Sequence, residues 1–199
     1  MHLPTIILLR HGQTKWNVEG RYQGQLNSDL TPLGKAQAEE NAFKIKKMLK
    51  GEKNSFTFVS SPLGRAKETA LIIADKLGFE QSKIIFDERI QEVNYGMFEG
   101  KTKLFCKTEH KEEFEERELN KWSYILADGG ESYEMVTKRI HRWLESIQDE
   151  KLVILVAHEM INRALRGVYC SYSKEDILSL RQKNDIVFKL ESGFEGIIE

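Results

Sequence analysis

The sequence predicts an α/β fold, a three-layer α/β/α sandwich in which helices cover both faces of a mostly parallel sheet. Apolar runs of strand length, rich in Ile and Val, recur along the chain at 5–9, 56–60, 83–86 and 152–157. These runs are continuous rather than alternating, as expected of strands that are covered on both faces. Segments with helical periodicity separate them, which favours parallel pairing. The segment 185–191 is expected to add an edge strand.

Two of the helical segments carry start and stop signals. Thr31 is a candidate N-cap, and Pro32 follows it in the first turn of a helix. In the next helical segment Ser61 is expected to cap the helix, Pro62 to begin it and Gly78 to end it. An apolar stripe along this second helix consists of Ala66, Ala70, Ile73, Ala74 and Leu77.

The length of 199 residues suits a single domain, residues 1–199, with one sizeable core. Residues 101–130 are charged, helix-prone and short of core residues, so they are expected to form a helical cap over the sheet. Within the cap, "EHKEEFEERELNK" is interpreted as a solvated helix face. Lys101, Lys103 and Lys107 precede it; they are candidates for contact with a second anionic group on a substrate, although solvent exposure is the preferred interpretation.

Composition excludes several classes of protein. Thirty basic and 31 acidic side chains nearly cancel to a net charge of −1, so neither nucleic acid nor an anionic membrane is an expected partner. Cys106 and Cys170 lie far apart without CxxC spacing, which argues against a zinc ribbon, a redox motif or a disulfide framework. The N-terminal apolar run is too short for a signal peptide or a membrane span, so a cytoplasmic protein is expected. The sequence does not indicate an oligomeric state.

Chemistry-bearing side chains follow the predicted strands, where ligands bind in a parallel α/β sheet. The first strand ends at Arg10 and His11. Arg65 lies in the first turn of the helix after the second strand, Glu92 follows the third strand, and the fourth ends at His158. Because the carboxyl ends of parallel strands meet at one edge of a sheet, these five side chains are expected to converge.

This set supports phosphoryl transfer. The planar forks of Arg10 and Arg65 match phosphate oxygens and neutralise charge that develops on them. A neutral His11 imidazole can attack phosphorus, and nearby cations are expected to keep it deprotonated, while His158 stabilises the transferring group. Glu92 can protonate the leaving oxygen and then act as a base toward water. Neither a metal nor a cofactor is required.

Several stretches together resemble the histidine phosphatase superfamily, the phosphoglycerate mutase-like proteins. They occur in the family's order and at roughly its spacing: "LLRHGQTKWN", "RYQGQLNSDLTPLGKAQAE", "VSSPLGRAKETA", "RIQEVNYGMFEG", "DGGESYEMVTKRI" and "VAHEMINRALRG". The resemblance implies a phosphorylated His11, and it adds Asn17, Gln23 and Gly24 as phosphate or substrate contacts. The short region after Gly100 favours the phosphatase branch over the glycolytic mutases.

Two further features bear on the site. Glu159 and Met160 stand where the family usually has a small Gly-rich turn, and the Glu159 carboxylate is a candidate for narrowing or altering the pocket. Glu88 and Glu99 are nearby carboxylates that could take the role of Glu92, but a structural hydrogen bond is preferred for Glu99. A zinc-protease motif is discounted because Asn162 stands where the second histidine would have to be.

The sequence therefore predicts a metal-independent phosphatase that acts on a small phosphorylated metabolite through a phosphohistidine. One alternative is a cofactor-dependent phosphoglycerate mutase, which shares the first half-reaction. Another is a catalytically idle regulator that binds a phosphorylated ligand. The substrate stays open among sugar phosphates, phosphoglycerates, fructose 2,6-bisphosphate and alpha-ribazole phosphate.

Overall fold

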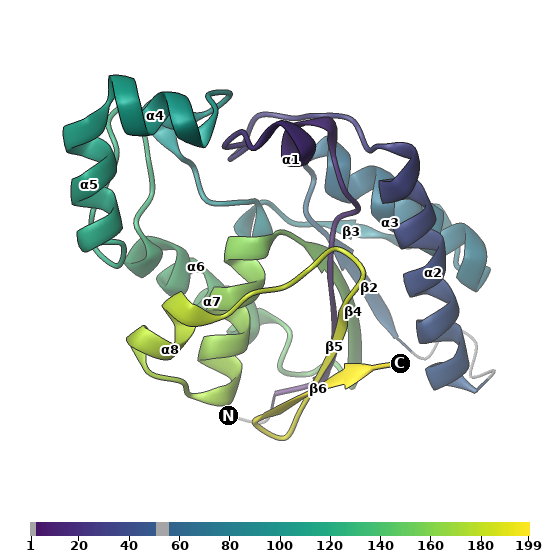
Figure 1. Ribbon diagram of the computed structural model, residues 1–199. Helices are drawn as coiled ribbons and strands as arrows, with labels where there is room; N and C mark the ends of the chain where they lie inside the picture. The colour runs from purple at the N-terminus through teal and green to yellow at the C-terminus, as the bar shows by residue number, and fades with distance from the viewer. Residues whose placement is uncertain (1–2, 51–55) are drawn as a thin grey trace.

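A six-stranded sheet forms the centre of the protein in the computed structural model, which describes residues 3–50 and 56–199 (Figure 1). The strand order is β3-β2-β4-β1-β5-β6. The first four of these pair in parallel, while β5 and β6 are antiparallel to their neighbours. The strands are β1 (Thr5–Arg10), β2 (Thr57–Ser60), β3 (Ile85–Phe86), β4 (Leu152–Ala157), β5 (Val187–Glu191) and β6 (Phe194–Ile198).

Helices cover both faces of this sheet, which confirms the predicted three-layer fold (Figure 1). On one face lie α2 (Pro32–Leu49) and α3 (Gly64–Leu77), and on the other α6 (Tyr133–Ser146) and α7 (Glu159–Cys170). The remaining elements are α1 (Lys15–Glu19), α4 (Lys103–Glu109), α5 (Lys111–Leu119), α8 (Lys174–Ser179) and the 3-10 helices η1 (Gln81–Lys83), η2 (Glu88–Ile90) and η3 (Gly96–Phe98).

The strand side chains alternate between two cores. In β1, Ile6 and Leu8 pack into the cluster with α6 and α7, whereas Ile7 and Leu9 pack into the cluster with α2 and α3. All four are fully buried. This double burial explains why the strand sequence is continuously apolar, and it holds β1 rigidly up to the point where Arg10 begins.

Two strand predictions are wrong in detail. The run 83–86 gives only the two-residue β3, and both of its residues are exposed because this strand is the outermost of the sheet. Residues 185–191 give β5, but β5 lies inside the sheet, with β6 at the edge. A tight turn with positive φ at Ser192 and Gly193 joins the two strands. The sequence did not reveal β6 because Glu195 and Gly196 interrupt its apolar pattern.

The helix signals are confirmed for α2 and partly for α3. The Thr31 side chain accepts a hydrogen bond from the backbone N–H of Gly34, and Pro32 begins α2. Gly78 ends α3 with a φ of 69°, a conformation that a glycine adopts readily. The start of α3 is later than predicted, at Gly64 rather than Pro62, because Ser61 lies two residues too early to cap the helix and contacts His158 instead.

The helices α4 and α5 lie at the end of the sheet where β1 leads into α1 (Figure 1). We call residues 101–130 the cap. A small apolar cluster of Tyr22, Phe98, Cys106 and Leu126 packs the cap onto the rest of the protein. The cap is helical only through Leu119, and turns and extended chain make up residues 120–130. Among the described residues, no helix is long and apolar enough to cross a membrane.

Candidate active site

His11 follows β1 directly, and its backbone N–H continues the ladder to Ala157 of β4 at 3.0 Å. The ring is buried, and its Nδ1 lies 2.8 Å from the carbonyl oxygen of Gly12. A carbonyl oxygen only accepts hydrogen bonds, so this contact assigns the proton to Nδ1. The other ring nitrogen, Nε2, accepts a hydrogen bond from Nε of Arg65 at 3.3 Å. His11 therefore presents an unprotonated Nε2 beside a guanidinium.

The environment keeps this imidazole neutral. Burial lowers the pKa of His11 well below its ordinary value, and the positive charges of Arg65 and Arg10 lower it further. The bond to the Gly12 carbonyl acts in the opposite direction but does not outweigh them. A neutral imidazole retains the lone pair that a nucleophile needs.

Two arginines flank His11. Arg65 is fully buried, and its Nη1 and Nη2 donate to the carbonyl oxygens of Leu26 and Gly24, each at 2.7 Å. Burial lowers the pKa of Arg65 to about 10, so the group still carries its charge at neutral pH. Arg10 donates from Nη1 to the carbonyl oxygen of Gln182 at 2.9 Å. Both side chains are thus held by backbone carbonyls in fixed positions.

His158 lies behind His11 rather than along the cavity. Its ring centroid is 5.2 Å from that of His11, and the residue is fully buried. Nε2 of His158 lies 2.7 Å from Oγ of Ser61, the residue that follows β2. Burial lowers the pKa of His158 well below its ordinary value, and Arg65 and His11 add to this effect. The neutral imidazoles of His11 and His158 therefore lie next to each other.

Glu92 lies in the loop after η2 and faces the same space. Its Oε1 accepts the N–H of Val93 at 3.0 Å, and its Oε2 accepts the N–H of Met160 at 3.4 Å. Burial raises the pKa of Glu92, and this effect exceeds the lowering by Arg65 and by the two backbone hydrogen bonds. The carboxyl group is therefore a proton donor at higher pH than an exposed glutamate.

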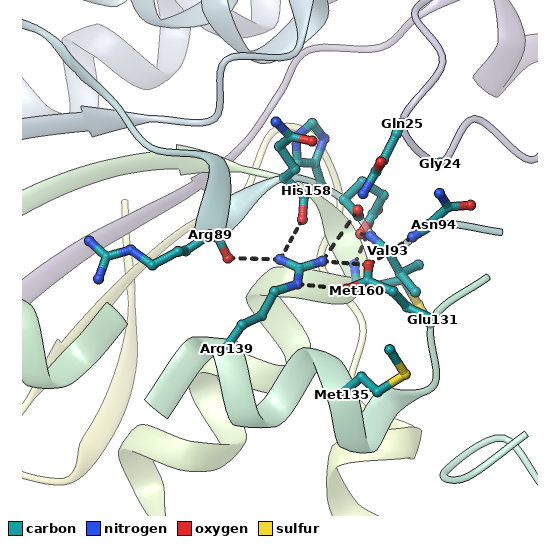
Figure 2. A network of polar contacts seen from close by, with 12 residues as sticks. Gly24, Gln25, Arg89, Val93, Asn94, Glu131, Met135, Arg139, His158 and Met160 are labelled. Carbon is teal, nitrogen blue, oxygen red and sulfur yellow. Dashed lines mark hydrogen bonds and ion pairs between the residues drawn. The ribbon is translucent and has the colours of Figure 1, made fainter. Parts of the chain in front are cut away.

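Arg139 of α6 fixes the loop that carries Glu92 (Figure 2). Its Nη1 donates to the carbonyl oxygens of Arg89 at 2.7 Å and Gln91 at 2.8 Å, and its Nη2 donates to that of Glu92 at 3.3 Å. Two further bonds, of 3.0 and 2.9 Å, join Arg139 to the carboxylate of Glu131. Sequence reasoning did not find Arg139, because it acts through backbone carbonyls that have no sequence signature.

The three contacts implied by resemblance also line the cavity: Asn17, Gln23 and Gly24. The side-chain oxygens of Asn17 and Gln23 accept hydrogen bonds from the N–H and the hydroxyl of Thr14, each at 3.0 Å, so their amide NH₂ groups remain as donors. Gly24 has φ of +53°, and a Cβ there would meet Oε1 of Glu99 at 1.8 Å.

Glu99 forms the structural hydrogen bonds predicted for it. Its Oε1 accepts the backbone N–H of Gln25 at 2.8 Å and that of Tyr95 at 3.1 Å. These bonds tie the loop that contains Gly24 to the loop that contains Glu92.

Residues 6–196 match the family model of the histidine phosphatase superfamily (branch 1). The chain belongs to the histidine phosphatase superfamily. It is 33% identical to a putative phosphoserine phosphatase 2 from Hydrogenobacter thermophilus over 181 residues, 90% of this chain and 85% of that one. It is 37% identical to a probable phosphoglycerate mutase GpmB from Escherichia coli over 144 residues, 72% of this chain and 63% of the relative.

Solved structures of the superfamily share the fold. Bacillus stearothermophilus YhfR has a TM-score of 0.80 and 27% identity, with 98% of this chain and 95% of that one covered. A mycobacterial glucosyl-3-phosphoglycerate phosphatase in complex with VO3 has a TM-score of 0.79 and 26% identity, with 94% and 91% covered.

Glu159, the first residue of α7, lies at the site. Its Oε2 forms an ion pair of 2.9 Å with Nη1 of Arg10, and both side chains are largely buried, with 27% and 14% exposed. Met160 lines the cavity, and its sulfur accepts a hydrogen bond from the Tyr133 hydroxyl at 2.9 Å. Glu159 and Met160 both lie in the wall of the cavity.

The interpretation of residues 109–121 as a solvated helix face is wrong for one side of α5. Phe114 and Arg117, three residues apart, turn inward and line the cavity together with Lys121. Of the three lysines at the start of the cap, Lys103 lines the cavity, whereas Lys101 contacts His110 at 3.4 Å. The cavity has a volume of about 300 Å³ and extends from His11 to the cap.

Proposed function

We propose that this chain is a phosphatase that hydrolyses phosphomonoesters of small metabolites through a phosphohistidine on His11, without a metal ion. The observation that carries the proposal is the unprotonated Nε2 of His11, which lies in a cavity 3.3 Å from the guanidinium of Arg65. A nucleophilic lone pair beside a fixed cation is the arrangement that phosphoryl transfer requires. The phosphatases among the relatives support the same reaction.

In the first half-reaction Arg10 and Arg65 bind the phosphoryl oxygens. Nε2 of His11 forms a bond to phosphorus, the ester P–O bond breaks, and Glu92 gives its proton to the leaving oxygen. The hydrogen bond from Nδ1 to the Gly12 carbonyl stabilises the positive charge that develops on the ring. His158 packs behind the His11 ring, with 5.2 Å between the ring centroids, and the amides of Asn17 and Gln23 add donors to the phosphoryl oxygens.

In the second half-reaction Glu92, now a carboxylate, takes a proton from water. The water oxygen forms a bond to phosphorus while the N–P bond breaks. Inorganic phosphate leaves, and His11 returns to its neutral form. The two arginines supply the positive charge that a metal ion supplies in other phosphoryl-transfer enzymes, which is the basis for proposing metal independence.

The mutase and the idle binder make different predictions. A mutase returns the phosphoryl group to an alcohol instead of water, and the 37% identity to the probable mutase GpmB makes this the second candidate. A protein that only binds a phosphorylated ligand requires neither a nucleophile nor a proton donor in its cavity. Phosphate release compared with phosphoglycerate interconversion, in one assay series, separates all three.

The direct test is a phosphate-release screen over a panel of metabolites, run with a chelator present. We expect turnover with the chelator, loss of turnover in His11→Asn, and no loss in His141→Asn, a control at an exposed histidine of α6. Full activity of His11→Asn would overturn the phosphohistidine. Loss of activity with the chelator, restored by a divalent cation, would overturn metal independence.

A further inference from the structure

Two buried amide side chains join distant segments to the end of β1. They are Asn162 in the first turns of α7 and Gln182 in the loop 180–186, which lies between α8 and β5. Nδ2 of Asn162 donates to the carbonyl oxygen of Leu9 and to Oε1 of Gln182, each at 3.0 Å. Nε2 of Gln182 donates to the carbonyl oxygen of Leu8 at 3.2 Å and to one in its own loop at 3.1 Å. The two amides therefore fix the loop against the last residues of β1.

The same loop holds the backbone and side chains that follow β1. The carbonyl oxygen of Gln182 accepts a hydrogen bond from Nη1 of Arg10 at 2.9 Å, and Nδ2 of Asn184 donates to the carbonyl oxygen of His11 at 2.6 Å. On its other side the loop is bonded to α2, because Nδ2 of Asn41 donates to the carbonyl oxygen of Asn184 at 2.9 Å. The loop is therefore attached both to α2 and to the two residues that carry the proposed chemistry.

The bonds that hold Arg10 all use the same nitrogen. Nη1 contacts the carbonyl oxygen of Gln182 and Oε2 of Glu159, each at 2.9 Å, whereas the buried Nε has no partner among the residues that the structure describes. Nε and Nη2 form one edge of a guanidinium, and the parallel N–H donors of that edge match two phosphate oxygens. Anchoring of Nη1 thus orients the guanidinium plane and leaves this edge for an anion.

Asn162 is more polar than the packing of α7 requires. The neighbouring side chain of Ile161 and that of Leu165 belong to the hydrophobic core. Oδ1 of Asn162 is buried without a partner among the described residues, and an unpaired buried acceptor is unfavourable for stability. A side chain that departs from local stability in this way is expected where function requires it.

We propose that Asn162 and Gln182 are positioning residues: they hold the Gln182 carbonyl oxygen where it orients the guanidinium of Arg10 toward the transferred phosphoryl group. Neither side chain lines the cavity that contains His11, so both act through Arg10. This inference rests on the proposed function for the identity of the group that Arg10 binds.

The test is a double-mutant cycle between Gln182 and Arg10, with inorganic phosphate as the ligand in calorimetry. Gln182→Met keeps the length of the side chain and removes its amide. We expect this variant to weaken phosphate binding by roughly 10-fold to 100-fold, as for the loss of a hydrogen bond to a charged group. In the Arg10→Met background the same substitution should change phosphate affinity by less than about 2-fold, because the side chain that Gln182 positions is gone.

A second cycle uses Asn162→Leu, which keeps a similar volume and removes the donor to Gln182. It should also weaken phosphate binding in the presence of Arg10 and have little effect in Arg10→Met. Each cycle is complete by itself, so the proposal stays testable if one of the two variants does not fold. Equal losses with and without Arg10, or no loss in either background, would overturn the positioning role.

The matched control for stability is Val153→Ala. Val153 is buried at the opposite end of β4 from His158 and contacts neither Asn162 nor the loop 180–186 through a hydrogen bond of its side chain. This variant should lower Tm but change phosphate affinity by less than about 2-fold. A comparable loss of phosphate affinity in Val153→Ala would show that lower stability alone accounts for the effect of Gln182→Met.

Phosphate binding does not require turnover, so the cycles separate the positioning role from the proposed function. If the effects of Gln182→Met and Arg10→Met are coupled while no phosphomonoester is hydrolysed, the positioning role holds and the phosphatase proposal fails. If the wild type hydrolyses phosphomonoesters and the two effects are independent, the phosphatase proposal holds and the positioning role fails.

Discussion

Replacement of Arg139 by methionine is predicted to reduce both stability and proton donation by Glu92. Methionine retains an apolar stem but removes a guanidinium that forms five hydrogen bonds (Figure 2). Three of these bonds hold the carbonyl oxygens of residues 89, 91 and 92, and two hold Glu131. Without them, Nη1 of Arg89 still donates to the carbonyl oxygen of Arg142 in α6 at 3.4 Å, but the carbonyl oxygens of Gln91 and Glu92 lose the donors that Arg139 supplies.

The magnitude follows from burial of the ion pair. Breaking a buried pair by removing one partner destabilises a protein by about 3–5 kcal/mol. Arg139 and Glu131 are 16% and 17% exposed, so water partly solvates the orphaned carboxylate, and we expect a loss of about 3 kcal/mol. For a domain of this size that corresponds to a fall in Tm of roughly 6–12 °C.

The catalytic effect is measured with two leaving groups. An alkyl phosphate needs a proton on its leaving oxygen, whereas p-nitrophenolate leaves without one, so Arg139→Met should lower kcat at least about 10-fold for the first and little for the second. The control is Lys138→Met on the same helix, whose exposed pair with Glu134 contributes less than about 1 kcal/mol. A fall in Tm with equal losses for both leaving groups would refute the positioning role of Arg139.

Three further predictions follow from the site. The pKa of Glu92 is raised and its protonated form is needed, so the turnover of an alkyl phosphate should decline as pH rises through that pKa. Glu92→Gln should lower kcat for this substrate by roughly 100-fold or more and should abolish the decline in its pH profile. A decline that persists in the variant would assign it to another group. Because the pKa values of His11 and His158 are lowered in the folded protein, the unfolded chain binds more protons than the folded one below about pH 6.5. The free energy of unfolding in urea should therefore fall with decreasing pH, by up to about 1.4 kcal/mol per pH unit for each histidine. His158→Asn should show a shallower slope, and a slope equal to that of the wild type would contradict the burial of a neutral ring. Glu159→Gln should remove the ion pair with Arg10 and lower the inhibition constant of inorganic phosphate about 3-fold to 10-fold. An unchanged constant would show that Glu159 does not compete with phosphate for Arg10.

The sequence predicted the site because its main residues lie at strand ends. Continuous apolar runs located β1, β2 and β4, and parallel pairing then required Arg10, His11 and His158 to meet at one edge. The position of Glu92 followed from the same rule although β3 has only two residues, because the backbone N–H of Asp87 still pairs with the carbonyl of Ser60. Strands that are buried on both faces leave continuous apolar runs in the sequence, and these runs predicted most of the sheet.

The features that the sequence did not predict depend on contacts between distant segments. Arg139 acts on carbonyl oxygens about 50 residues away, so no local pattern marks it. Arg117 is one charge in a run of charges, and only the packing of Phe114 into the cluster beneath the cap determines which side faces inward. The ion pair of Glu159 with Arg10 likewise required the end of β1 and the start of α7 to be adjacent.

Identification of the phosphorylated atom tests the central claim most directly. The protein is mixed with a turned-over phosphomonoester labelled in its phosphoryl group, quenched in base within the first turnovers, and mapped by mass spectrometry. The account predicts an acid-labile, base-stable phosphate on the His11 imidazole that is absent from His11→Asn and accumulates in Glu92→Gln when p-nitrophenyl phosphate is the donor. Turnover without label on His11, or label on another residue, would contradict it.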